Sequence, residues 1–336
     1  MPVTRHRITS RERWLKLRQR DITASDVAAI CGIHPKRTPM MVYAEKKGLL
    51  TNGETNLMQR GRWFEPAILT AFEDERPDLK LQKPAIYLRD PELRIGATMD
   101  FLGIDEQDRR GAVEGKVVAY PEFLAKWVEN GFTHEAASEW LDESEWLDED
   151  GAGITPGVKI VAPLHYQFQV LTQAKLAGLD WAMIGALAVD AYKAHLYVVD
   201  VELVDSAWEF IKARVADFWE RFDSGRTPDL TPALDAKALA ALYPVDNGQT
   251  VDLTGDPEAK RLLSEWESEE AILKAAKKQI KPHEERLREI KNQFKAKLGA
   301  NETGLVNGYH VSWRTQHRAA VAATSFRVIR KKKVKI

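Results

Sequence analysis

The chain has 336 residues, 44% of them hydrophobic and 29% charged, which is enough for one folded core with an appendage or for two domains. Its formal net charge of −1 gives no whole-chain signature of nucleic-acid binding, and its single cysteine, Cys31, excludes a disulfide framework or a cysteine-based metal site within one subunit. No apolar run approaches the length of a membrane span and Met1–Ser10 has no signal-peptide core, so we expect a cytoplasmic protein without membrane contact.

The predicted elements alternate between helices and strands along the first 230 residues. Helices are predicted at 10–20, 23–32, 39–47 and 54–75, and strands from about 80 to 118. A helix over 121–130 and an acidic stretch over 135–150 come next, the latter interpreted as a solvated surface or a phosphate mimic. A helix over 163–178, strands over 181–189 and 191–201, and a helix over 205–222 complete the pattern, which predicts an α/β core over residues 1–230.

The last third of the sequence is predicted to be an appendage. Proline and glycine punctuate residues 231–255, which we expect to be a linker. Residues 256–299 predict a long charged helix with a break near Pro282, because proline removes a backbone donor. Its sparse apolar positions favour a helical hairpin or a short coiled coil. The domain over 256–336 would then end in two short strands over 308–330 and a basic tail.

Asp100 and the segment Glu114-Gly115-Lys116 lie in two apolar runs that predict neighbouring strands. Residues two apart in a strand point the same way, so Glu114 and Lys116 share a face, and a hairpin through 102–110 brings Asp100 beside them. Two carboxylates can hold a hard cation such as Mg²⁺, while a lysine can orient or deprotonate an attacking water. The set predicts metal-assisted phosphodiester cleavage, although such acid–base pairs also occur as surface salt bridges.

Further polar residues fit the same chemistry. Glu65 lies among aromatic residues in a predicted helix, where a carboxylate is costly unless it is paired or binds a cation; an exposed helix glutamate is the alternative. Gln167 and Gln169 are amides in an otherwise apolar helix, and Gln169 lies beside Gln173 at i, i+4. An amide there can donate to a scissile phosphate oxygen or make one buried hydrogen bond.

An anion site is predicted near the N-terminus. Trp14 and Arg18 precede Ser25, and together they combine a guanidinium, a hydroxyl and the free N–H groups of a helix start. A terminal DNA phosphate would suit this site, whereas helix capping alone is the simpler interpretation.

Taken in order, these motifs resemble those of the lambda-type phage exonucleases, also described as YqaJ-like viral recombinases, in the PD-(D/E)xK nuclease superfamily. The resemblance covers residues 10–222, including Gly61-x-x-x-Glu65 and Gly-Ala-Thr-Met-Asp100. It implies a restriction-endonuclease-like α/β core with a mixed central sheet flanked by helices. The appendage has no counterpart in the compact members of the family.

The resemblance also implies a role for each site residue. Asp100 and Glu114 would bind Mg²⁺, two ions per site with Mn²⁺ as a substitute, helped by the Gly115 carbonyl and by Glu65. Lys116 would position the nucleophilic water and Gln167 would support the reacting phosphate. The 5′-phosphate and DNA contacts would come from the N-terminal residues and the second amide: Trp14, Arg18, Ser25 and Gln169.

The implied activity is 5′-to-3′ degradation of one strand of linear double-stranded DNA, leaving 3′ overhangs for a single-strand annealing protein in phage-type recombination. A homo-oligomer is implied as well, of which a trimeric ring is the best-known form, in the cytoplasm of a bacterial host if the gene is carried by a phage. A restriction-like or structure-specific endonuclease and a catalytically silent DNA-end-binding protein are the alternatives. The single cysteine and the absence of a phosphate-binding loop disfavour two other nuclease classes, one with a cysteine cluster and one driven by ATP.

Overall fold

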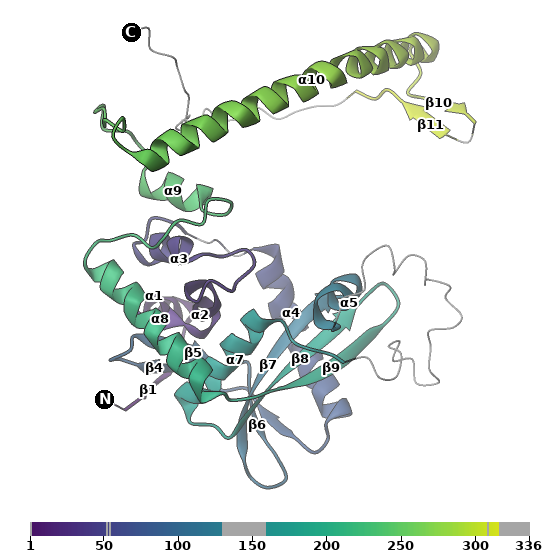
Figure 1. Ribbon diagram of the computed structural model, residues 1–336. Helices are drawn as coiled ribbons and strands as arrows, with labels where there is room; N and C mark the ends of the chain where they lie inside the picture. Colours follow the sequence, from purple (N-terminus) through teal and green to yellow (C-terminus); the bar gives the residue numbers. More distant parts are fainter. Residues whose placement is uncertain (1, 52, 54, 130–158, 308, 316–336) are drawn as a thin grey trace. The chain divides into compact units, whose positions relative to one another are not determined.

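A computed structural model describes residues 2–51, 53, 55–129, 159–307 and 309–315 (Figure 1). The chain divides into two compact units, Met1–Pro244 and Val245–Ile336. The acidic stretch over 135–150 and the basic tail lie outside the described residues. No helix in the described part of the chain is long and apolar enough to cross a membrane.

The first unit is built on a mixed five-stranded sheet. Its central strands β7 and β8 are parallel, and the other neighbours are antiparallel. In spatial order the strands are β3 (Lys80–Gln82), β6 (Phe101–Ile104), β7 (Arg110–Ala119), β8 (Trp181–Val189) and β9 (Ala194–Val201). The predicted α/β core with a mixed central sheet is confirmed.

A second sheet of four strands lies in the same unit, in the order β1-β4-β5-β2. It contains a short N-terminal strand that the sequence did not predict, and it takes two strands from the region predicted as one group over 80–118. Its members are β1 (Thr4–Arg7), β2 (Ile22–Thr23), β4 (Ile86–Asp90) and β5 (Ile95–Thr98). The chain leaves this sheet at Thr98 and enters the central sheet at Phe101, so Asp100 lies between the two sheets.

Helices cover both faces of the central sheet (Figure 1). On one face, Ile68 and Phe72 of α4 (Asn56–Glu75) pack with Val113 and Met183. On the other, α5 (Tyr120–Trp127) and α7 (Leu164–Ala177) contribute residues that pack with the alternate strand positions: Phe123, Trp127, Val170 and Ala174 against Ala112, Val118 and Ile184. Glu114 and Lys116 share the strand face of Ala112, so they point toward α7.

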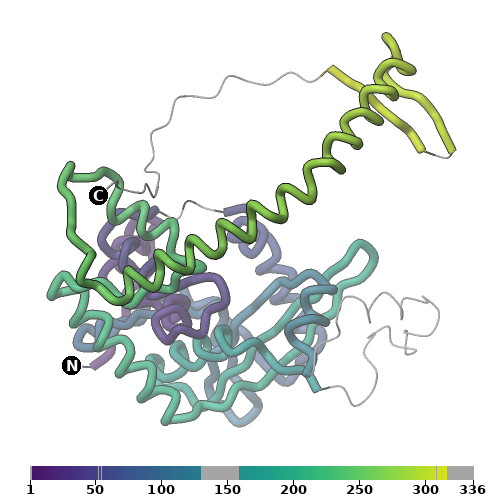
Figure 2. Tube along the Cα trace, turned by 45° about the horizontal axis from the view of Figure 1, so that its top comes forward, coloured from purple at the N-terminus to yellow at the C-terminus, as the bar shows by residue number. Residues whose placement is uncertain are grey.

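A helical layer packs beside the second sheet (Figure 2). It shares one apolar cluster with β2 and β5, to which α2 (Ala24–Ile30), α3 (Pro39–Lys46) and α8 (Asp205–Asp223) contribute. Helix α1 (Arg11–Gln19) has no buried residue and lies against β2. Helix α9 (Ala236–Leu242) packs on α3, where Ala238 meets Met40 and Ala44. Asp235 is fully buried and accepts a hydrogen bond from the Thr38 hydroxyl. The prediction of a linker beginning at 231 is therefore wrong, because this buried polar pair ties the segment to the core.

The second unit contains helix α10 (Pro257–Leu298), which is 42 residues long, and a hairpin of β10 (Thr303–Val306) with β11 (Tyr309–Ser312). The predicted break near Pro282 is wrong, and with it the helical hairpin. A proline removes only one hydrogen bond from a helix that can propagate on both sides of it. The strands also begin before residue 308, and residues 316–330 lie outside the described residues. The coiled-coil alternative stays a prediction.

Candidate active site

Asp100 and Glu114 face each other across the hairpin of β6 and β7. The ladder pairs Phe101 with Val113, so Asp100, one residue earlier, falls opposite Glu114. Asp100 Oδ2 accepts a hydrogen bond of 3.1 Å from the Gly115 N–H. The structure thus brings Asp100 beside Glu114 and beside the strand that carries Lys116, as the spacing predicted.

Glu114 is the buried acid of the pair, with 2% of its surface exposed. Its Oε1 accepts from Lys116 Nζ at 2.5 Å and from Gln169 Nε2, and its Oε2 accepts from Gln173 Nε2 at 2.7 Å. Burying a carboxylate is costly unless its oxygens are paired. Three donors from β7 and α7 satisfy that requirement and hold the side chain in one orientation.

Asp100 and Lys116 have perturbed proton affinities. Burial, and then the neighbouring Glu114, raises the pKa of Asp100 to about 8, against the opposing effects of Lys116 and the Gly115 N–H. Burial acts to lower the pKa of Lys116, but Glu114 and Asp100 outweigh it, so that pKa is raised. The Tyr166 ring lies 4.8 Å from Lys116 Nζ, a cation–π contact that favours the same charged form. Both shifts reduce the net negative charge of the site: the ammonium form of Lys116 and the protonated form of Asp100 are favoured.

This donor set fits a divalent cation. Burial and the adjacent Glu114 raise the pKa of Asp100 in spite of Lys116, so a further positive charge here would favour the ionised carboxyl. Mg²⁺ commonly binds through one or two carboxylates and keeps several waters, so Asp100, Glu114 and the Gly115 carbonyl would suffice to hold it. Within the described ranges no cluster of three acidic, histidine or cysteine ligands is found.

Glu65 lies at the edge of this carboxylate pair. Its one-turn neighbour on α4, Ile68, packs under Gly115, where an added Cβ would lie 3.0 Å from an Ile68 methyl group. Glu65 is close enough to Asp100 to help raise its pKa. Its carboxylate forms an ion pair of 2.6 Å with Lys83, so the structure places it near the site but turned toward the solvent side.

The two predicted amides of α7 separate in the structure. Gln167 donates to the Ala162 carbonyl at 2.6 Å, at the start of the helix, whereas Gln169 contacts both Glu114 and Lys116. Gln173, one turn further, is fully buried and shares Glu114 with Gln169. Gln173 was not predicted as a site residue. Its i, i+4 spacing from Gln169 was the signal in the sequence that could have identified it.

Trp14, Arg18 and Ser25 come together as predicted. Arg18 Nη2 donates to Ser25 Oγ at 3.0 Å, and the guanidinium stacks 4.6 Å from the centre of the Trp14 ring. At the start of the following helix, the N–H of the N-cap residue Thr23 is not free, because it donates to the Asp26 carboxylate in a capping box. The anion site consequently rests on the guanidinium and the hydroxyl more than on the helix start.

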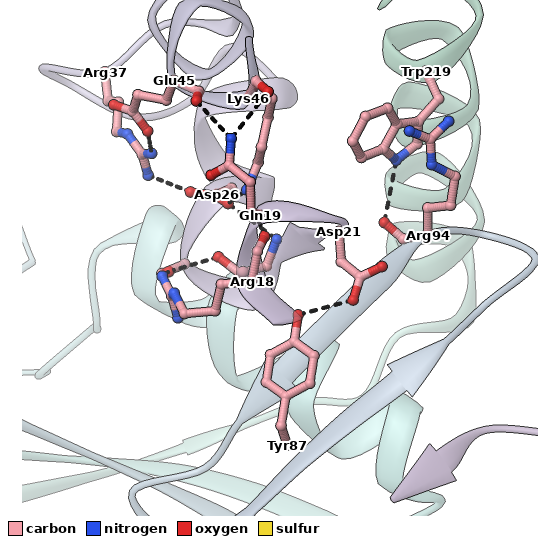
Figure 3. Close-up of polar contacts among 12 residues, drawn as sticks. Arg18, Gln19, Asp21, Asp26, Arg37, Glu45, Lys46, Tyr87, Arg94 and Trp219 are labelled. Carbon is pink, nitrogen blue, oxygen red and sulfur yellow. Dashed lines mark hydrogen bonds and ion pairs between the residues drawn. The ribbon is translucent and has the colours of Figure 1, made fainter. Parts of the chain in front are cut away.

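A buried charge network supports this site (Figure 3). Asp26 is 2% exposed and binds Arg37 at 2.5 Å and Lys46 at 3.1 Å. Lys46 also donates to the Arg18 carbonyl at 3.0 Å, and Gln19 donates to the Glu45 carbonyl at 2.9 Å. Sequence reasoning missed this network, because its members come from three helices and from the loop before α3, and share no short motif.

Thr98 connects the two groups of site residues. Its hydroxyl accepts from the Trp14 indole N–H at 2.9 Å, and its carbonyl accepts from Gln173 Nε2 at 3.0 Å. The same Gln173 nitrogen donates to Glu114. The anion site and the carboxylate pair therefore share one strand end, with three hydrogen bonds between Trp14 and Glu114.

Comparison with known proteins places the sequence in a family. The family described as YqaJ-like viral recombinase domain matches residues 13–180. The uncharacterized protein YqaJ of Bacillus subtilis (strain 168) is 22% identical over 324 residues, which cover 91% of this chain and 83% of the relative.

Solved structures with a similar arrangement include an alkaline exonuclease from Laribacter hongkongensis, at 18% identity and a TM-score of 0.44, covering 64% of this chain and 93% of that one. A phage-related exonuclease from Haemophilus somnus 129PT has 15% identity and a TM-score of 0.40, covering 61% and 94%. The predicted resemblance to the YqaJ-like viral recombinases is confirmed by the family match. The chain belongs to the YqaJ-like viral recombinase domain family.

Proposed function

We propose that the protein is a Mg²⁺-dependent exonuclease that degrades one strand of linear double-stranded DNA from its 5′ end and leaves 3′ overhangs for a single-strand annealing protein. Membership of a viral recombinase family supports a nuclease. The observation that carries the proposal is the pairing of a carboxylate site with an anion site at one strand end, joined by Thr98. An end-specific enzyme needs both, because a terminal phosphate must be bound close to the bond that is cut.

The residues of the site have separable tasks in this proposal. When bound, a divalent cation supplies charge neutralisation at the scissile phosphate. Asp100 and Glu114 would hold it, and the amides of Gln169 and Gln173 fix the Glu114 carboxylate. The raised pKa of Lys116 favours its ammonium form. As an ammonium, Lys116 would orient the attacking water by donating N–H bonds and stabilise developing negative charge, whereas it could not accept a proton from that water.

Arg18 and Ser25 would bind the 5′-phosphate of the strand being degraded. An arginine binds a phosphate through parallel N–H bonds, and the Trp14 ring holds this guanidinium flat. Affinity for duplex ends should fall with added salt, because each phosphate contact releases counterions.

The decisive experiment is digestion of linear duplex labelled at either the 5′ or the 3′ end, with and without Mg²⁺, beside closed circular DNA. We expect loss of the 5′ label first, no cleavage without the metal and intact circles. Asp100→Asn should slow cleavage by at least ~100-fold, on the scale of one lost electrostatic contact to the transition state. Nicked circles would instead support an endonuclease, and undiminished function of Asp100→Asn would support end binding alone.

The anion site is tested separately by Arg18→Ala. Its digestion of 5′-phosphorylated ends should slow more than its digestion of 5′-hydroxyl ends. Equal slowing on both substrates would contradict the assignment of Arg18 and Ser25 to the terminal phosphate.

A further inference from the structure

Helix α10 is long but almost unsupported by its own chain. Of its 42 residues only Leu298 is buried among the described residues. Helices in proteins take most of their stability from packing of an apolar face, and Pro282 inside this helix costs about 3 kcal/mol. Ion pairs along the helix, such as Arg261 with Glu258 and Glu265, are exposed to solvent and add little to its stability. Within the described part of its unit, the helix meets the β10–β11 hairpin region at its C-terminal end, where Leu298 lies near Gly304 and Lys295 lies over the Trp313 ring. Its central aliphatic residues are not buried there.

The apolar residues of α10 follow a heptad repeat. Every seventh residue over six repeats is apolar, and these six residues are Ala259, Trp266, Leu273, Ile280, Leu287 and Phe294. The aliphatic members in the middle of this series are exposed: Leu273 by 57%, Ile280 by 52% and Leu287 by 50%. A seven-residue apolar repeat is the sequence pattern of a coiled coil. Pro282 lies outside the repeat.

The second core series of the repeat decides the orientation. Three residues after each member of the first series, apolar and polar side chains alternate: Leu262, Glu269, Ala276, His283, Ile290 and Lys297. In a parallel pair each would face its own copy, so that Glu269 would meet Glu269 and Lys297 would meet Lys297. In an antiparallel pair centred on Lys278, Leu262 faces Phe294, Trp266 faces Ile290 and Ala276 faces Ile280. The charged residues then face apolar neighbours instead of like charges.

The charge distribution along the helix agrees with that orientation. Residues 257–270 contain five acidic and two basic side chains, whereas residues 285–298 contain two acidic and five basic ones. An antiparallel pair places the acidic end of one helix beside the basic end of the other over about 63 Å of helix. A parallel pair would place like charge beside like charge at both ends.

We infer that two copies of this chain associate through an antiparallel coiled coil of α10, with the heptad residues above as its core. The occupant of the exposed apolar stripe is thus a second copy, and the appendage is a dimerisation element. This inference does not depend on the nuclease proposal.

Spin labels on the full-length protein test the orientation. Cysteines replace Ser264 or Lys278, one at a time, on the outward face of the helix; the wild type, whose Cys31 is buried, controls for background labelling. At Lys278, the centre of the pair, we expect a distance between copies of roughly 20–25 Å, about two helix widths. At Ser264 the partner label is offset by 28 residues, or about 42 Å along the axis, so the distance should roughly double.

Equal distances at both positions, or no dipolar coupling at either, would overturn the inference. The second result would leave residues 316–336 or a different protein as the cover of the stripe. Ile280→Asp in the labelled proteins should abolish the short distance. Ala271→Asp, which adds the same charge on the outward face and costs more helix propensity, should leave it. A short distance that survives Ile280→Asp would come from another interface and would also refute the α10 pair.

Discussion

Asp26 provides the sharpest test of the charge network behind the anion site. Asp26→Asn keeps the shape of the side chain and an oxygen that can accept from the Thr23 N–H, but removes the negative charge. Lys46, whose side chain is 7% exposed, then keeps only neutral acceptors: the amide oxygen at the place of Asp26 Oδ2 and the Arg18 carbonyl at 3.0 Å. Arg37 keeps its ion pair with Glu45. The substitution therefore leaves one buried cation without a counter-charge.

The cost follows from these distances. At an effective dielectric of 20, the attraction between Asp26 and Lys46 at 3.1 Å is about 5 kcal/mol. Desolvation of the buried carboxylate, which the variant avoids, offsets part of that attraction. Breaking one partner of a buried pair typically costs about 3–5 kcal/mol. We expect about 3 kcal/mol, near the lower limit, because Arg37 retains Glu45.

Urea unfolding followed by tryptophan fluorescence measures this loss. The matched control is Asp78→Asn, which removes an ion pair with Arg76 in which both side chains are about one-third or more exposed. Exposed pairs contribute about 0–1 kcal/mol, so the control should lose less than 1 kcal/mol. Equal losses in the two variants would refute the reasoning.

The effect of Asp26 should also depend on pH in a defined direction. Burial alone would raise the pKa of Asp26, but Lys46, Arg37 and Arg18 outweigh it and hold that pKa far below its ordinary value of 3.8. A group with a lowered folded-state pKa contributes its full stability above the unfolded-state pKa and loses it as the pH falls further. The difference between the wild type and Asp26→Asn should therefore persist from pH 7 to about 5 and shrink below pH 3.8. A difference that grows on acidification would contradict this sign.

Three further substitutions give expected outcomes. Gly185→Ala should destabilise the core by about 1–3 kcal/mol in urea unfolding, because the new Cβ would lie 2.2 Å from the Phe72 ring; unchanged stability would show that Phe72 can move. Gly61→Ala, where nothing lies within 4 Å, should stabilise α4 by up to about 1 kcal/mol, and a simultaneous loss of nuclease activity would indicate that DNA approaches this glycine. Thr98→Val should raise KM for 5′-phosphorylated ends several-fold with little change in kcat, because it removes the acceptor of the Trp14 indole; a loss confined to kcat would argue against this route.

Periodic features of the chain were accessible from the sequence. The alternation in β7 predicted that Glu114 and Lys116 share a face, and the hairpin length predicted that Asp100 lies beside them, as the ladder shows. Apart from α9, which lies in the predicted linker, the described helices of the core were predicted to within a few residues, since helical periodicity and capping residues are local signals. The long apolar repeat of α10 was visible too, although the effect of Pro282 on the helix was overestimated.

Contacts between distant segments were not accessible. Gln167 and Gln169 are equivalent amides in the sequence, and only the packing of α7 on β7 turns Gln169 toward Glu114 and Gln167 toward the Ala162 carbonyl. The burial of Asp235 against Thr38, almost two hundred residues away, likewise assigns residues 231–244 to the core rather than to a linker.

The sequence by itself thus determined which side chains of the candidate site lie together on β7 and α7, because strand and helix periods set which side chains share a face. Only the tertiary structure decided how they are connected. Thr98 links the anion site to Glu114, and Asp26 supports Arg18 through Lys46, because each link joins segments that meet only when the two sheets and the helical layer pack together. Such pairings depend on the fold as a whole, and no local pattern of residues encodes them.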